Sequence, residues 1–169
     1  MKAALLCPGP SLLAFNEAPR YDLTIGVNRA VLAFPCDWWA VQDWQLFGDT
    51  HPDGNPAVFT TLDCMEAIRR HGGSYRLAHR LLRYIADVYF YEPAPDYWAL
   101  YTATAALILA WDQGATSITC YGCDREGVDD YDGTSRTSDN RTDERWQRES
   151  RIWRDVVIWL RDHGMRVHE

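Results

Sequence analysis

The chain has 169 residues, of which 47% are hydrophobic and 13% aromatic, and its formal net charge is −7. This length and apolar share fit one domain with a sizeable core. The acidic balance excludes nucleic-acid binding through a general basic field, because such binding depends on counterion displacement; a local basic pocket for a phosphate stays compatible with it. No apolar run reaches membrane-spanning length. The apolar run at the amino terminus is too short for a secretory signal, so a cytoplasmic location is expected.

Apolar runs that stop at turn-forming residues predict strands at 3–6, 23–27, 38–41, 57–60, 117–121 and 165–168, with at least one more within 81–91. Helices are predicted at 11–15, 62–71, 102–113 and 146–163, and the last has the clearest amphipathic spacing. Residues 125–145 are strongly polar and predict a long lid-like loop. Strands separated by helices indicate a mostly parallel sheet. We expect one α/β domain over residues 1–169, a three-layer Rossmann-like arrangement with helices on both faces of the sheet.

Residues that follow strands are the first candidates for a site, because open parallel sheets bind ligands at the carboxyl ends of their strands. After the first strand, Gly9 lets a ligand approach the backbone. The helix that follows Pro10, capped by Ser11, offers N–H groups and a hydroxyl to a phosphate. The alternative is an ordinary tight turn with a Ser11 cap, and this segment alone favours that alternative.

After the second strand, the Asn28 amide can bind a base or ribose, and Arg29 can pair with a phosphate. The alternative is that Asn28 caps a helix and Arg29 is solvated. Asp43 follows the third strand and can bind Mg²⁺ or a ribose hydroxyl. An N-cap for the next turn is the equal alternative for Asp43.

Thr102 and Thr104 begin a helix, where their hydroxyls can bind a phosphate or cap the helix. Gly122 and Asp124 follow the strand at 117–121, and a functional role is favoured for Asp124. Arg141, in the polar loop, is expected to close over a bound phosphate.

The five cysteines are odd in number and scattered along the chain. Cys120 and Cys123 form a lone CxxC inside an apolar strand pattern. Without a second CxxC or a paired His, reduced and buried thiols are a better interpretation than a zinc site.

Taken in order, these segments resemble the MptE-like proteins, which are 6-hydroxymethylpterin diphosphokinase-like, and the small bacterial sialyltransferases. The resemblance lies in the runs 7–12, 25–30, 37–43 and 102–124, and it covers about residues 1–125 by pattern. Both groups carry a Gly-Pro-Ser-Leu turn after the first strand and an Asn after the second. The resemblance implies a Rossmann-like fold that binds a nucleotide.

The two groups imply different donors. In the sialyltransferases the ligand is a cytidine monophosphate sugar, so residues 9–11, Asn28 and the helix start at Thr102 and Thr104 would hold the nucleotide and its phosphate. Asp124 would then lie near the ribose or the reacting phosphate. In the MptE-like group, diphosphate passes from ATP to a pterin alcohol with Mg²⁺, for which Asp43 and Asp124 would be the ligands. Mg²⁺ is the one cofactor that the sequence suggests.

The chain departs from the sialyltransferases in its catalytic half, where they use a His base and a pair of tyrosines. No His lies between Asp124 and His163. His51 is the candidate substitute, with an exposed loop His as the alternative. The sequence therefore leaves three hypotheses open. They are a transferase that moves a glycosyl, phosphoryl or diphosphoryl group to a small-molecule or glycan acceptor, a non-catalytic nucleotide-binding module, and a protein-interaction domain. A homodimer would use the Trp146, Trp153 and Trp159 face of the last helix.

Overall fold

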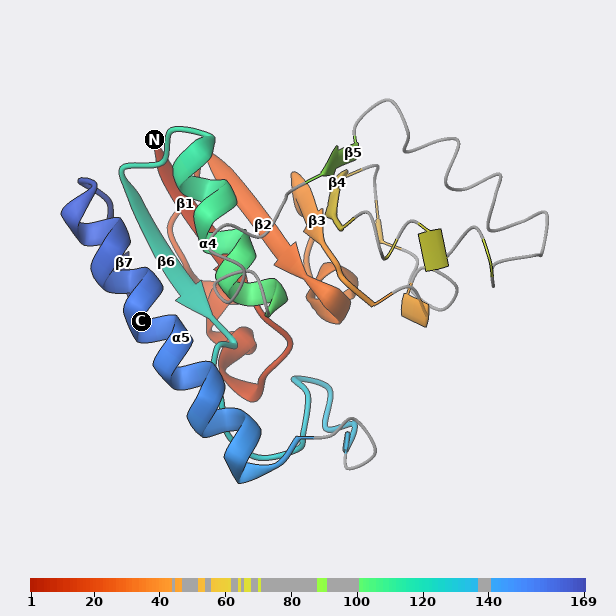
Figure 1. Cartoon of the computed structure of the whole chain (residues 1–169). Coiled ribbons are helices and arrows are strands. Elements are labelled where there is room, and N and C mark those ends of the chain that lie inside the picture. Colours follow the sequence, from red (N-terminus) through yellow and green to blue (C-terminus); the bar gives the residue numbers. More distant parts are fainter. Residues whose placement is uncertain are drawn as a thin grey trace.

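The strands that can be described in the computed structural model form one parallel sheet (Figure 1). The structure describes residues 1–43, 45–46, 52–53, 56–61, 64, 66–67, 70, 88–90, 101–136 and 141–169. The strands are β1 (Lys2–Leu6), β2 (Leu23–Val27), β3 (Trp38–Ala40), β4 (Ala57–Thr60), β5 (Val88–Phe90), β6 (Ser117–Tyr121) and β7 (Arg166–His168). They lie in the order β5-β4-β3-β2-β1-β6-β7, and each neighbouring pair is parallel. The expected α/β class with a parallel sheet is confirmed, and it is compatible with a Rossmann-like fold.

The order of the strands places the candidate site. From β1 the chain adds strands in one direction as far as β5, and it then returns to add β6 and β7 on the other side of β1. The order therefore reverses between β1 and β6. In open α/β sheets, the connections that leave two such strands diverge to opposite sides and leave a crevice at their carboxyl ends.

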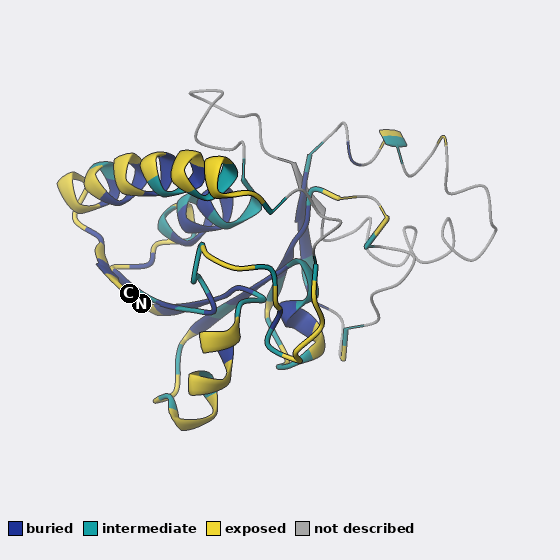
Figure 2. Ribbon diagram, turned by 90° about the horizontal axis from the view of Figure 1, so that it is seen from below, coloured by how far each residue is buried: buried dark blue, intermediate teal, exposed yellow. Residues whose placement is uncertain are grey.

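Among the helices in the described part of the chain, two α-helices cover one face of the sheet and two 3₁₀ helices lie on the other (Figure 2). They are α4 (Thr102–Asp112) and α5 (Asp143–Asp162), and η1 (Pro10–Glu17) and η2 (Asn28–Leu32). Most of the helix expected at 62–71 lies outside the described residues, although residues 64, 66–67 and 70 are helical. The predicted strand ranges agree with the observed bounds to within one residue, and β5 falls inside 81–91.

The central strand β1 is buried on both faces, as its uninterrupted apolar sequence requires. Alternate side chains point to opposite sides: Ala3 and Leu5 join the core beneath α4 and α5, whereas Ala4 and Leu6 join the smaller core around η1 and η2. All four residues have no exposed surface. A polar substitution at any of them would bury an unpaired group next to the turn that begins the candidate site.

Two helix starts differ from the prediction. The helix after β1 has Gly9 as its N-cap with no side-chain cap, so Ser11 lies inside the helix. Pro10 explains the shift, because its φ angle is already suited to the first helical position. The last helix begins at Asp143 instead of Trp146, and the Thr142 hydroxyl caps it by accepting the Arg145 N–H at 3.2 Å. The polar loop, predicted at 125–145, therefore ends before Asp143.

The amphipathic prediction for α5 is confirmed, since Ile152, Val156 and Leu160 are buried on one side of it. Trp153 is buried with them at 3% exposure, so it does not belong to a surface for a homodimer, contrary to expectation. Within the residues that the structure describes, no helix combines the length and apolar character needed to cross a membrane.

Because the end of β1 lies so close to the end of β6, we predict that a side chain at Gly122 would strongly reduce the free energy of unfolding. Gly122 has φ +70°, and a Cβ there would overlap the Cys7 carbonyl oxygen. Gly114 has φ +85°, but a Cβ at that position would meet nothing within 4 Å. Gly114→Ala is therefore the control that measures the cost of the positive φ without any steric overlap. We expect Gly114→Ala to cost about 1–2 kcal/mol of unfolding free energy and Gly122→Ala more than about 3 kcal/mol. Denaturant unfolding of both variants checks this, and equal losses would contradict it.

Candidate functional site

A cavity of about 410 Å³ lies at the carboxyl ends of β1, β2 and β6, where the strand order reverses. This volume is within the range of small-molecule and cofactor sites, about 300–1,000 Å³. Several residues expected to form a site line it together, although they come from distant parts of the chain. They are Gly9, Asn28, Asp43, Thr102, Gly122, Asp124 and Arg141.

Four other candidates do not line this cavity, and His51 lies outside the described residues. Pro10 is exposed. Arg29 forms an ion pair with Asp132 of the polar loop, at 3.5 Å. The buried Thr104 hydroxyl donates to the Tyr101 carbonyl at 2.8 Å. Ser11, the fourth, bonds to the end of β6.

Two backbone N–H groups of the turn after β1, which were expected to hold a phosphate, already donate to residues that follow β6. The Gly9 N–H donates to the Gly122 carbonyl at 3.0 Å. The Ser11 N–H donates to Asp124 Oδ2 at 3.1 Å, and the Ser11 hydroxyl accepts the Gly122 N–H at 3.1 Å. A Cβ on Gly9 would overlap Asp124 Oδ2. Gly9 is therefore needed for the close approach of Asp124, and the carboxylate occupies the place predicted for an anion.

The first turn of α4 supplies the free donors instead. Its N-cap, Tyr101, makes no side-chain cap, and the first bond inside the helix runs from the Ala105 N–H to the Tyr101 carbonyl at 3.1 Å. Thr102 and Ala103 line the cavity. Among the described residues, their N–H groups have no acceptor. The Thr102 hydroxyl donates to Gln42 Oε1 at 3.2 Å. A helix start with free N–H groups and a positive dipole end suits an anion.

Backbone strain concentrates at the cavity. Asn28 (φ 51°) and Arg125 (φ 49°) are the non-glycine residues with positive φ in the described ranges, and both line the cavity. The Trp39 indole N–H donates to the Asn28 carbonyl at 2.9 Å and helps to hold that conformation. Such strain persists only where the surrounding structure imposes it, and it is common at functional sites.

Among the residues that the structure describes, the buried polar atoms of the cavity wall that have no hydrogen-bond partner include Asn28 Oδ1, Arg125 Nη1 and Trp153 Nε1. The second terminal nitrogen of Arg125, Nη2, pairs with Glu169 at 2.9 Å. The Arg125 guanidinium lies 4.4 Å from the centre of the Trp153 ring. A buried polar atom without a partner costs about 1–3 kcal/mol. A bound ligand with both donors and acceptors would recover that energy.

Glu149 is a functional candidate that the sequence analysis missed. It lines the cavity from α5, only 8% of it is exposed, and it makes no hydrogen bond or ion pair within the described part of the chain. Burial raises the pKa of its carboxyl group, although Arg145 and Arg125 act to lower it. The sequence did carry a signal, because Glu149 lies three and four residues before Ile152 and Trp153 and so falls on the apolar face of α5.

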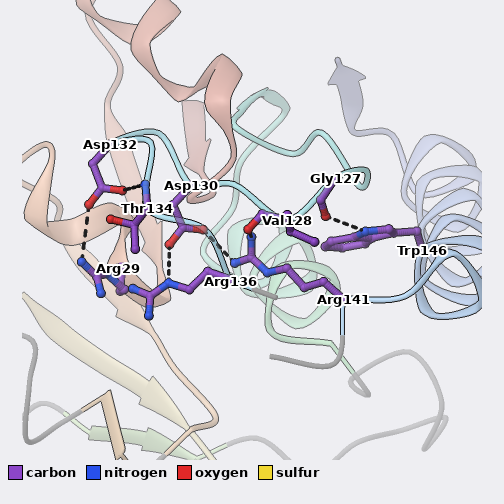
Figure 3. Close-up of polar contacts among 9 residues, drawn as sticks. All are labelled: Arg29, Gly127, Val128, Asp130, Asp132, Thr134, Arg136, Arg141 and Trp146. Carbon is purple, nitrogen blue, oxygen red and sulfur yellow. Dashed lines mark hydrogen bonds and ion pairs between the residues drawn. The ribbon is translucent and has the colours of Figure 1, made fainter. Parts of the chain in front are cut away.

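The described part of the polar loop is tied to the rest of the site (Figure 3). Asp130 is buried and accepts from Arg136 Nε at 3.1 Å and from Arg141 Nη2 at 2.7 Å. Burial raises the pKa of Asp130, against the effect of Arg141. The Tyr131 N–H donates to the Pro8 carbonyl at 2.8 Å, which joins the loop to the turn after β1. These contacts fix Arg141 at the cavity wall before any ligand binds.

Charge and aromatic rings share the cavity wall. Arg125, Arg141 and Arg145 line it, as do the rings of Tyr101 and Trp146. The Arg145 guanidinium lies over both rings, 5.9 and 5.6 Å from their centres. The Trp146 indole N–H donates to the Gly127 carbonyl at 3.0 Å, which fixes its orientation. Guanidinium groups beside aromatic faces suit a ligand that has both an anionic group and a flat ring.

Asp43 and Asp124 both line the cavity but do not form a ready-made metal site. Within the ranges that the structure describes, no three or more His, Cys, Asp or Glu side chains are arranged to hold a metal ion. Asp43 Oδ1 accepts the Gln45 N–H at 3.4 Å, which is the capping geometry weighed as the alternative. Mg²⁺ often uses one or two carboxylates together with substrate phosphates. These two residues therefore fit Mg²⁺ only as part of a site that a phosphorylated ligand completes.

Comparisons with protein-family models, with curated proteins and with solved structures give no match for this chain.

The buried carboxyl of Glu149 leads to a prediction about stability. A raised pKa in the folded state contributes stability that is fully present below the ordinary Glu value of 4.5 and is lost as the pH rises through the folded-state pKa. Glutamine does not titrate, so Glu149→Gln should be more stable than the unmodified chain at neutral pH, by a margin that shrinks towards acid pH. Denaturant unfolding over a pH series measures the margin.

Glu144→Gln is the matched control, because it makes the same change on an exposed position of α5. We expect it to bring no gain, since Glu144 lies in the first helical turn, where negative charge is favourable. A Glu149→Gln chain that is less stable than the unmodified one at neutral pH would show that the carboxylate has a stabilising partner.

Proposed function

We propose that this chain binds a nucleotide or nucleotide sugar in the cavity and transfers a glycosyl, phosphoryl or diphosphoryl group from it to a small-molecule or glycan acceptor. One observation carries the proposal: Asn28, Thr102 and Asp124, which the chain holds far apart, line one cavity where the strand order reverses. Nucleotides bind at such points in open α/β sheets. The expected three-layer Rossmann-like arrangement and the cytoplasmic location belong to this proposal.

The phosphate binds at the first turn of α4. The free N–H groups of Thr102 and Ala103 support this placement, and Arg141 and Arg145 at the wall supply positive charge. The Asn28 amide then bonds to the ribose or base, which gives its buried Oδ1 a donor. If the reaction uses Mg²⁺, Asp43 and Asp124 are the residues that would hold it beside the phosphates, where it would neutralise their charge.

Glu149 favours an enzyme over a passive binding module. A carboxyl group with a raised pKa in a cleft is suited to accept a proton near neutral pH. In the proposed step the acceptor hydroxyl gives its proton to the Glu149 carboxylate while its oxygen bonds to the sugar carbon or phosphorus of the donor. The bond to the leaving phosphate breaks, and the arginines stabilise the charge left on that phosphate. Glu149 thus takes the role for which the sequence suggested only His51, Asp124 or Asp43.

The resemblance to the MptE-like proteins and the small bacterial sialyltransferases is part of the proposal and decides which donors to test. Cytidine monophosphate, a cytidine monophosphate sugar, ADP and ATP form the panel, each with and without Mg²⁺. A ligand that binds only the folded chain stabilises it by about 2.7 kcal/mol at one hundred times its Kd. A thermal-shift screen that finds no stabilisation by any of them would contradict nucleotide binding.

Asn28→Gly tests the binding site without a folding penalty. Glycine adopts positive φ freely, so the variant keeps the backbone at φ 51° and removes only the amide. We expect folding stability equal to or above that of the unmodified chain and affinity for the nucleotide about fivefold lower, the loss of one hydrogen bond. Titration calorimetry with the nucleotide from the screen measures this. Asp132→Asn, outside the cavity, is the control, and an equal loss there would contradict the role of Asn28.

Glu149→Gln tests the chemistry separately from binding. We expect the variant to bind the donor with nearly unchanged affinity and to lose about 10²–10⁴-fold in turnover, the usual contribution of a general base. Release of the nucleotide product, followed by chromatography, measures turnover, and Glu144→Gln again controls for the change in charge. Turnover that survives in Glu149→Gln would exclude this residue as the base. Binding without turnover in the unmodified chain would favour the non-catalytic module.

A further inference from the structure

An open groove lies against α5, next to the candidate site. Its volume is about 630 Å³, and its two walls are α5 and residues 125–127 of the loop after β6. We call it the α5 groove. The lining residues used below are Arg125, Glu126, Asp143, Trp146, Arg151 and Arg154. Three of them, Arg125, Glu126 and Trp146, also line the cavity at the strand ends, so the groove and the cavity adjoin each other.

Arginine side chains dominate the charge of the α5 groove. Arg151 and Arg154 are three residues apart on α5, so they share one face of the helix, and both are exposed. Neither guanidinium forms an ion pair with any residue that the structure describes. Arg125 adds a third guanidinium from the loop side. The whole chain carries a net charge of −7, so this positive charge is a local feature of the groove.

The acidic residues of the groove leave one of its ends positive. Asp143 lies in the first turn of α5, where the helix dipole favours a carboxylate. Because a helix rises 1.5 Å per residue, Arg151 and Arg154 lie about 12 Å and about 16 Å further along the axis. Both separations exceed the Debye length of about 8 Å at physiological ionic strength. Glu126 is on the loop side, beside Arg125. An anionic group would therefore bind at the end formed by Arg151 and Arg154.

Trp146 stands where the groove meets the cavity. Its indole N–H donates to the Gly127 carbonyl at 3.0 Å, so the ring is held between α5 and the loop (Figure 3). The Arg145 guanidinium lies 5.6 Å from the centre of this ring and lines the cavity, but Arg145 does not line the groove. A fixed aromatic ring offers an apolar surface on which a ring of a ligand can pack.

We propose that the α5 groove binds the acceptor of the transfer reaction, and that this acceptor carries a carboxylate or phosphate group. The anionic group pairs with Arg151 and Arg154. A ring of the acceptor packs on Trp146, and its hydroxyl extends past that residue into the cavity, where Glu149 would take the proton. This inference rests on the proposed function, since an acceptor needs a donor in the cavity, and it adds the chemical class of the second substrate.

Three sugars that differ in charge test the groove. Glucuronic acid carries a carboxylate, glucose 6-phosphate carries a phosphate, and glucose carries neither. Each is titrated into the 15N-labelled full-length chain, and the backbone amide signals of Gln147, Ser150 and Arg151 are followed by NMR. We expect at least one charged sugar to bind about tenfold more tightly than glucose, and added salt to weaken that binding.

The two charged sugars distinguish the sources of the anionic group. Tighter binding of glucuronic acid alone supports a carboxylate acceptor, and tighter binding of glucose 6-phosphate alone supports a phosphorylated one. If neither charged sugar binds more tightly than glucose, the proposal is overturned.

Arginine variants show whether the groove is responsible. The double variant Arg151→Gln and Arg154→Gln should bind the charged sugar about tenfold more weakly, because charge-assisted hydrogen bonds are lost. Arg148→Gln is the matched control, since Arg148 is an exposed arginine of α5 that lines neither the groove nor the cavity. Equal losses in the two chains would overturn the proposal. Circular dichroism checks that each variant folds.

Nucleotide binding and transfer separate this inference from the proposed function. With the nucleotide donor from the thermal-shift screen, we expect the double variant to raise the KM for the charged sugar and to change kcat little. Donor binding combined with no preference for charged sugars would overturn the acceptor assignment and leave the proposed function standing. Charged-sugar binding in a chain that binds no nucleotide would overturn both.

Discussion

The site depends on the close contact between the turn after β1 and the end of β6. The Gly9 N–H bonds to the Gly122 carbonyl, and the Ser11 N–H bonds to the Asp124 carboxylate. Neither glycine can carry a side chain here, because a Cβ on either one would overlap atoms of the opposite segment. Since this contact brings together the two strands between which the order reverses, it determines where the cavity opens. It also gives Asp124 a structural role, whatever else that carboxylate does.

The contact changes the way in which the cavity can bind an anion. A helix start beside the first strand is the usual phosphate position in such sheets, but here Asp124 already supplies the negative charge. The free N–H groups belong instead to α4, which enters the cavity from the other face of the sheet (Figure 2). Arg141 and Arg145 line the same cavity as the first turn of α4. Positive charge and free donors therefore occur together, which is the arrangement that a phosphate requires.

The cavity holds features that lower the stability of the empty protein. Asn28 and Arg125 have strained backbone. Among the described residues, Asn28 Oδ1 and Trp153 Nε1 find no partner, and the buried Glu149 makes no ion pair. The buried carboxylate of Asp130, by contrast, pairs with Arg136 and Arg141. Natural proteins tolerate unfavourable groups mainly where function needs them. Their concentration around one cavity is a physical reason, independent of the motifs, to regard it as the functional site.

The sequence by itself determined the strands, their parallel arrangement and the meeting of residues such as Asn28, Thr102 and Asp124 at one edge. These follow from local patterns: an apolar run forms a buried strand, a turn residue ends it, and parallel strands place those ends together. Only the tertiary structure decided which groups remain free. Ser11 and Asp124 are 113 residues apart, and their bond occupies the Ser11 N–H that was expected to hold a phosphate. Arg29 likewise pairs with Asp132, while Glu149 makes no ion pair with any residue in the part of the chain that the structure describes. A hydrogen-bonding group is free or occupied according to its neighbours in space, which local sequence does not specify.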